Sequence, residues 1–170
     1  SLVMTVVSVL GCVFFEWLYN KLLKKPMTIT DGSAVVTGML LAYTLPVTAP
    51  YWVVLIGDFF AIIVVKSMCG GLGQNIFNPA LAARAFMLLI FPVGLTRYVG
   101  VDGATAATPL HHMVMPALPE ESLLDMFLGN CPGSIGEISA LALIAGGVYL
   151  VIRKVISART PVAYIGTVAV

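Results

Sequence analysis

Thr108 is the side chain in this sequence whose surroundings most favour chemical modification. It lies in the run Asp102-Gly103-Ala104-Thr105-Ala106-Ala107-Thr108-Pro109-Leu110, within the longest polar interruption of a strongly apolar chain. Its hydroxyl is a nucleophile, the two alanines before it would not obstruct a modifying enzyme, and Pro109 biases it towards an extended backbone. Asp102 supplies an anionic anchor upstream. A loop of small residues with an Asp-Gly turn has the same composition, so the motif alone leaves both interpretations open.

The composition is that of a membrane protein. Of the 170 residues, 59% are hydrophobic and 10% are charged, and the mean hydropathy is +1.01. Soluble domains carry about 25% charged residues, so a lipid bilayer is the expected environment. The net charge of +1 gives no reason to expect nucleic acid as a partner. Because the chain opens on Ser1 and ends shortly after Pro161, we expect residues 1–170 to be one transmembrane domain, a fragment of a longer chain.

Successive apolar runs predict an all-α polytopic membrane protein with about six spans. Two runs have only 12 residues each, about 18 Å at 1.5 Å per residue, and fall well short of a hydrocarbon core of about 30 Å. Short segments interrupted by Gly or Pro are typical of broken helices around a site near the membrane midplane. We therefore expect half of a larger inverted-repeat fold. The runs are residues 2–19, 34–45, 51–65, 80–91, 133–152 and 161–170, and the second and fourth are the short ones.

The positive-inside rule orients these spans. Lys21, Lys24 and Lys25 form the densest basic cluster, which predicts a cytoplasmic position. Lys66 ends the third run, and further basic residues follow the fifth run, which agrees with that count. The polar loop 97–132, which carries Thr108 and more acidic than basic residues, is then extracytoplasmic.

Two features of the fourth run suggest binding. Asn78 followed by Pro79 predicts a helix start, with Asn78 as the N-cap. Free backbone N–H groups there could receive an anionic or carbonyl group, or the helix could simply be capped. Arg84 lies inside this short helix and needs either an ion-pair partner or a polar ligand, because an arginine facing lipid costs several kcal/mol.

Acidic residues within the runs allow two interpretations. Asp58, in mid-span, is either on an ion or proton pathway or a neutral carboxylic acid hydrogen-bonded to a neighbour, and we prefer the second. Glu16 and Glu137 lie near helix ends, so we expect both at the membrane interface. Gly136 and Ala140 are four residues apart, which predicts close packing of one helix face.

Metal sites are not predicted. Cys12, Cys69 and Cys131 form no Cys-x-x-Cys pair, which argues against an iron–sulfur or zinc site built from this chain. Cys12 is most simply a small packing residue. His111 and His112 are adjacent, so their side chains would point apart in an extended loop.

Three runs together resemble the D subunit of the Rnf complex, an ion-translocating ferredoxin:NAD oxidoreductase, and the related B subunit of the sodium-pumping NADH:quinone reductase. They are Asp31 to Gly38, Gly70 to Ala80 and Asp102 to Leu110. The resemblance implies FMN joined by a phosphoester to the last threonine of the motif, here Thr108, by a flavin transferase acting outside the cytoplasm. The quinone-reductase protein usually has Ser-Gly-Ala-Thr at this site. The stretch Thr105-Ala106-Ala107-Thr108 favours the Rnf protein.

The resemblance also implies roles for neighbouring residues. Asp102, Thr105 and Ala107 would belong to the flavin-attachment motif, with Thr105 as a recognition or phosphate-contact residue rather than a second attachment point. A second, non-covalent flavin such as riboflavin is one candidate partner for Arg84, towards the cytoplasmic side, and for Asn78. A structural ion pair is the alternative for Arg84.

The leading functional hypothesis is an electron carrier with covalent FMN, one subunit of a redox-driven ion translocase in a prokaryotic cell membrane. Its partners would be other membrane and peripheral subunits of that complex. A solute channel or transporter built from broken helices, without a redox cofactor, is the main alternative. A non-redox scaffold subunit is the third. The motif does not distinguish Na⁺ from H⁺ as the coupling ion.

Overall fold

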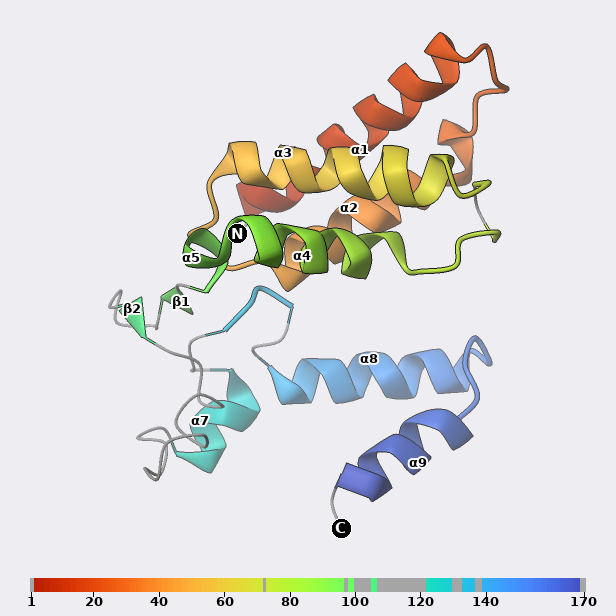
Figure 1. The fold of residues 1–170 in the computed structure, drawn as a ribbon. Coiled ribbons are helices and arrows are strands. Elements are labelled where there is room, and N and C mark those ends of the chain that lie inside the picture. The colour runs from red at the N-terminus through yellow and green to blue at the C-terminus, as the bar shows by residue number, and fades with distance from the viewer. Residues whose placement is uncertain are drawn as a thin grey trace.

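A computed structural model of the chain describes residues 2–71, 73–96, 98–99, 105–106, 122–129, 133–136 and 139–168 (Figure 1). The regular secondary structure of these residues is helical apart from one short hairpin, which confirms the predicted all-helical class. The helices are α1 (Leu2–Leu22), η1 (Ile29–Asp31), α2 (Ser33–Thr44), α3 (Tyr51–Phe59), η2 (Phe60–Ser67), α4 (Pro79–Ile90), α5 (Pro92–Leu95), α7 (Leu123–Leu128), α8 (Ala140–Ile152) and α9 (Arg159–Val168). In the hairpin, β1 (Tyr98–Val99) pairs antiparallel with β2 (Thr105–Ala106).

The start of α4 follows from its sequence, as predicted. The Asn78 side chain accepts hydrogen bonds from the backbone N–H groups of Ala80 and Leu81, at 3.0 and 3.3 Å. Pro79 occupies the first helical position, where no backbone N–H is needed. Two of the free donors at this helix end are therefore satisfied by the cap.

The third apolar run forms one continuous helix with a change of hydrogen-bonding pattern inside it. α3 is α-helical to Phe59, and η2 continues from Phe60 as a π-helix to Ser67. π-Helical segments are rare and occur often at functional sites. Asp58 lies just before this change.

The first four long helices form a bundle. α1 packs against α2, α3 and η2, and α4 packs against α2, α3 and η2. Figure 1 shows α1 and α3 running in one direction and α2 and α4 in the other. Their apolar core includes Leu41, Leu45, Val54 and Met87, all fully buried.

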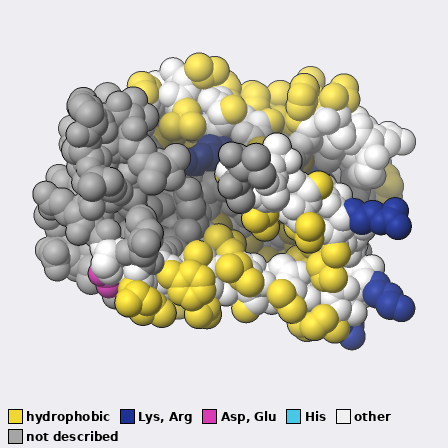
Figure 2. All heavy atoms as spheres, turned by 90° about the horizontal axis from the view of Figure 1, so that it is seen from below, with side chains coloured by type: hydrophobic (Ala, Val, Ile, Leu, Met, Phe, Trp, Pro, Cys, Tyr) yellow, Lys and Arg dark blue, Asp and Glu magenta, His cyan; other side chains and the backbone are white. Residues whose placement is uncertain are grey.

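The two ends of the bundle differ in chemistry. The turn after α1, the connection between η2 and α4, and the turn between α8 and α9 all lie at the right-hand end in Figure 1, and the β-hairpin and α7 lie at the other. Lysine and arginine side chains project at that right-hand end in Figure 2. The described lysines at the first turn, Lys21, Lys24 and Lys25, are exposed.

α1 differs from the other described helices in its length. Among the described residues, α1 alone is long and apolar enough to cross a membrane by length and composition, while α2, α4 and α8 are shorter apolar helices. Within the predicted span 133–152, the described helix is α8, which begins at Ala140, and the described residues 133–136 are not helical. Gly136 lies in a turn, where its N–H donates to the Tyr43 carbonyl at 2.9 Å. The predicted helix face shared by Gly136 and Ala140 is therefore wrong, because tertiary contact with α2 holds this segment as a turn.

α8 and α9 form a separate apolar pair. α8 contacts α7, and no described residue of α8 or α9 is buried. Their side chains line an apolar groove that includes Leu143, Val148 and Ile165.

Candidate functional site

The buried face of α1 is polar. Ser8, Cys12, Glu16 and Asn20 recur at every fourth position, and each is at most 5% exposed. Residues four apart lie one above another on a helix, about 6 Å apart along its axis. Large apolar side chains such as Leu10 and Phe14 lie exposed on the same helix. α1 therefore turns a polar seam towards the bundle and apolar side chains outward.

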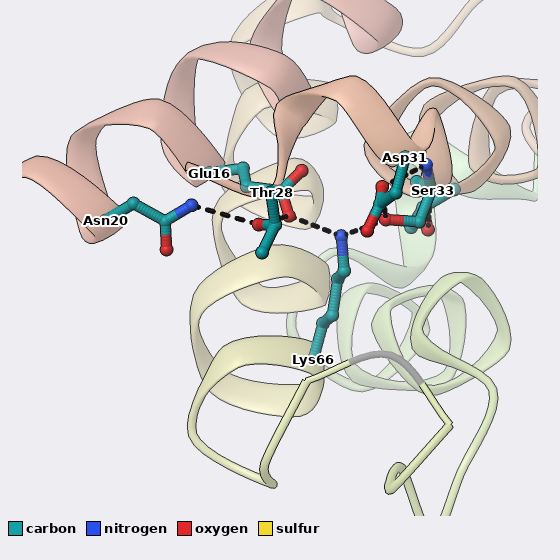
Figure 3. A network of polar contacts seen from close by, with 7 residues as sticks. Glu16, Asn20, Thr28, Asp31, Ser33 and Lys66 are labelled. Carbon is teal, nitrogen blue, oxygen red and sulfur yellow. Dashed lines mark hydrogen bonds and ion pairs between the residues drawn. The ribbon is translucent and has the colours of Figure 1, made fainter. Parts of the chain in front are cut away.

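Glu16 forms a buried ion pair with Lys66. Lys66 Nζ lies 2.7 Å from Glu16 Oε1, and the side chains are 5% and 3% exposed (Figure 3). Glu16 therefore faces protein rather than lipid, and its expected depth at the membrane interface stays a prediction. A charge on either side chain alone would be costly inside the bundle, and each supplies the other's partner.

Hydrogen bonds extend the pair in both directions. Glu16 Oε1 also accepts from the Thr28 hydroxyl at 2.8 Å, and Thr28 accepts from the Asn20 amide at 3.0 Å (Figure 3). On the other side, Lys66 Nζ donates to Ser33 Oγ at 2.5 Å. Glu16 Oε2 is buried without a hydrogen-bond partner.

The network ends on Asp31 in η1. Its carboxylate accepts from the backbone N–H of Ser33 at 2.8 Å and from the Ser33 hydroxyl. Partial burial would raise the pKa of Asp31, but these hydrogen bonds from Ser33 and the charge of Lys66 together hold it below its usual value. Asp31 is thus an anion that orients Ser33 towards Lys66.

A cavity of about 140 Å³, lined mainly by polar and charged residues, opens beside this network. Glu16, Thr28, Asp31 and Lys66 contribute to its wall, and the glycine-rich connector closes it at Gly70 and Gly71. Both glycines have positive φ, 109° and 93°, which side chains rarely tolerate. The Gly70 to Ala80 run therefore shapes this cavity as well as the approach to α4.

Asp58 lies further inside the bundle. It is fully buried, and its Oδ1 atom is 2.6 Å from Ser8 Oγ and 3.3 Å from Cys12 Sγ. The expectation that this carboxyl is hydrogen-bonded to a neighbour is confirmed. Cys12 is a buried packing residue, as expected, and also one of these hydrogen-bond partners.

Arg84 reaches the hairpin that carries part of the threonine motif. Its Nη2 atom donates to the Tyr98 hydroxyl at 3.4 Å, and its Nη1 atom is buried without a hydrogen-bond partner. Tyr98 is paired with Ala106 in the β-hairpin, and Val99 with Thr105. This contact contradicts the expectation that Arg84 lies away from the motif, whereas its expected cytoplasmic side stays a prediction. Its long side chain contacts the element that holds Thr105.

The remaining predicted site residues fall into two groups. The Asn78 side chain accepts hydrogen bonds from the backbone N–H groups that a ligand would need. The structure therefore favours a capped helix end without a bound ligand. Thr108, Asp102 and Ala107 lie outside the described residues.

Comparison with known proteins agrees with the resemblance of the three sequence runs. The model of the NQR2, RnfD, RnfE family matches residues 1–170. The chain belongs to this family.

Members of the family named as Rnf-type subunits are among the similar proteins. The D subunit of the Na⁺-translocating ferredoxin:NAD⁺ oxidoreductase complex of Acetobacterium woodii is 47% identical over 178 residues, covering 100% of this chain and 55% of the relative. The D subunit of the proton-translocating complex of Clostridium ljungdahlii is 41% identical, covering 100% of this chain and 56% of the relative. The chain thus spans about half the length of these relatives.

The quinone-reductase branch of the family is also similar. The B subunit of the Na⁺-translocating NADH-quinone reductase of Neisseria meningitidis is 38% identical over 158 residues, covering 86% of this chain and 38% of the relative. The two Rnf-type relatives are named for different ions, so membership of the family does not by itself fix the coupling ion.

The polar seam of α1 is a feature of the site that the sequence analysis did not predict. The fourfold spacing of Ser8, Cys12, Glu16 and Asn20 was visible in the sequence. Such spacing predicts that one face of a membrane helix contacts protein rather than lipid.

Proposed function

We propose that this chain is part of a membrane subunit that carries electrons through a covalently bound FMN, in an ion-translocating complex of the ferredoxin:NAD oxidoreductase type. The family match over residues 1–170, together with the run from Asp102 to Thr108, carries this proposal. The flavin would supply the redox chemistry, and the protein would fix its place and surroundings.

The separation of the two bundle ends supports the proposed attachment from outside. The lysine-bearing first turn lies at one end, and the hairpin with Thr105 and Ala106 lies at the other (Figure 1). If the end that carries the lysines is cytoplasmic, as the positive-inside rule predicts, the hairpin lies on the extracytoplasmic side. This orientation agrees with a flavin transferase acting outside the cytoplasm.

Arg84 fits the proposed flavin. Its Nη1 atom is a buried donor without a partner, and a guanidinium with a free donor is suited to a phosphate or a ring carbonyl. Because Nη2 of the same side chain contacts Tyr98 in the hairpin, we assign Arg84 to the covalent FMN rather than to a second flavin. Arg84 would hold and orient the bound group and would exchange no electrons itself.

A channel or transporter remains the second candidate, and the short α2 and α4 are the observation that favours it. Mass spectrometry of the intact full-length protein, produced together with a flavin transferase, separates the two candidates. A flavin phosphate adduct supports the electron carrier. Its absence, when the transferase modifies a known substrate in the same cells, would contradict it.

A further inference from the structure

The Ser8 hydroxyl lies between two oxygen atoms. Its Oγ atom is 2.6 Å from Asp58 Oδ1 and 2.9 Å from the Gly38 carbonyl oxygen. Both distances are those of O–H···O hydrogen bonds. Cys12 Sγ approaches the same Asp58 oxygen at 3.3 Å. The four groups come from α1, α2 and α3, and all are buried.

The number of hydrogens decides how these contacts are made. A serine hydroxyl has one proton to donate, and a backbone carbonyl has none. If Asp58 is ionised, Ser8 can donate to Asp58 or to Gly38 but not to both, and one short contact then lacks a hydrogen. If Asp58 is protonated on Oδ1, it donates to Ser8, Ser8 donates to Gly38, and Oδ1 still accepts from Cys12. A neutral carboxylic acid alone gives every contact a hydrogen.

The charges around Asp58 lead to the same result. α1 presents Ser8 and Cys12 to it, α2 presents a carbonyl, and α4 packs the apolar Met87 beside Gly57. The nearest cation along its own helix is Lys66, eight residues on, which is paired with Glu16. Asp58 Oδ2 is buried without a hydrogen-bond partner. A bare anionic oxygen in that position would cost several kcal/mol, whereas the carbonyl oxygen of a neutral acid costs far less.

Two features show that the fold makes room for this group. A Cβ atom at Gly11 would lie 2.5 Å from Asp58 Oδ2, and one at Gly38 would lie 2.8 Å from Val9 Cα. Glycine at both positions therefore allows the helices to close around the carboxyl. The second feature is the π-helix η2, which begins at Phe60, two residues after Asp58. The backbone hydrogen bonding of this helix therefore changes next to the carboxyl.

We propose that Asp58 and Ser8 form a proton-binding site inside the bundle, in which the Asp58 carboxyl holds a proton and donates it to Ser8. Release of that proton to water leaves a carboxylate, and the Ser8 hydroxyl then turns from Gly38 to Asp58. The ligand of the site is therefore a proton. The site depends on neither the flavin nor its attachment.

Infrared spectroscopy of the purified complex containing the full-length protein tests this proposal. The wild-type protein should show the C=O band of a protonated carboxyl that shifts in D₂O. Asp58→Asn should remove it, while Asp31→Asn, at an exposed anionic residue, should leave it unchanged. Asn keeps the size of Asp and can donate to Ser8, so the variant should assemble normally.

Ser8→Ala provides the second arm. Loss of the acceptor should move the same band to higher frequency without removing it. The proposal is overturned if Asp58→Asn assembles and leaves the carboxylic-acid bands unchanged. If Asp58→Asn does not assemble, an unmoved band in Ser8→Ala overturns it. Disappearance of the band on adding NaCl to Na⁺-free protein would also overturn it, because a metal cation would then be the ligand.

Discussion

Lys66 Nζ lies 2.7 Å from Glu16 Oε1, inside the bundle and between helices that run in the same direction. The Ser8–Asp58 contact has the same sequence separation, because each of its members stands eight residues earlier on the same helix. One parallel register of α1 against α3 and η2 therefore aligns both polar contacts.

Removing one member of the Glu16–Lys66 pair should destabilise the protein. Glu16→Ala leaves Lys66 as an uncompensated buried charge, for which we expect a loss of about 3–5 kcal/mol. The double variant Glu16→Gln with Lys66→Met should recover most of it. Thermal unfolding of the purified full-length protein measures the effect, with Lys24→Met at an exposed lysine as the control. Equal stabilities for Glu16→Ala and Lys24→Met would contradict a buried pair.

Close packing of α1 on α2 should depend on Gly38. A Cβ there would lie 2.8 Å from Val9 Cα and 2.9 Å from the Ser8 carbonyl oxygen, both backbone atoms that cannot move aside alone. Gly38→Ala should cost about 1–3 kcal/mol in the same unfolding measurement. Gly94→Ala is the matched control, because the nearest atom to its Cβ is 3.9 Å away. An unchanged midpoint for Gly38→Ala would show that the two helices are not packed this tightly.

Attachment of the flavin should depend on Thr108. Thr108→Ala should abolish covalent flavin fluorescence of the denatured chain on a gel, because that hydroxyl forms the proposed phosphoester. Thr105→Ala keeps this hydroxyl and should retain some fluorescence. A fluorescent Thr108→Ala chain would move the attachment to another residue.

Arg84 should tune the bound flavin without being needed for its attachment. Arg84→Gln removes a positive charge beside the hairpin, so the reduced, more negative flavin should be less stable. We expect the midpoint potential to fall by tens of millivolts, where about 30 mV of a two-electron couple equals about 1.4 kcal/mol. Redox titration of the flavin absorbance measures the shift, with Arg153→Gln as the control, because Arg153 directly follows α8 at the end away from the hairpin. An unchanged midpoint potential in Arg84→Gln would contradict the assignment of Arg84 to the flavin site.

The two ends of the bundle should face opposite sides of the membrane. In a background without Cys69 and Cys131, Ala104→Cys should react from outside with a thiol reagent that cannot cross membranes. Lys24→Cys should react only from the cytoplasmic side, because the lysine cluster is expected there. Labelling of both positions from one face of sealed vesicles would contradict the proposed orientation.

The sequence by itself determined the features that depend on local chemistry. The apolar runs specified helices, and Asn78 with Pro79 specified where α4 begins, because a cap needs only residues adjacent in the chain. The three sequence runs also indicated the family. The uneven distribution of lysines indicated which connections between helices lie on the same side of the membrane, because the positive-inside rule needs only the sequence near each span.

Only the tertiary structure decided which side chains meet. The distance of Glu16 from a helix end is visible in the sequence. Its partner Lys66 is 50 residues away and approaches only when α1 and η2 lie side by side. The contact between Arg84 and Tyr98 could not be predicted for the same reason, because a long side chain contacts whichever element packs beside its helix. Gly136 became a turn through contact with Tyr43 rather than through its own preference. Inside a membrane bundle, polar groups must find partners, and the packing of the helices determines which partners are within reach.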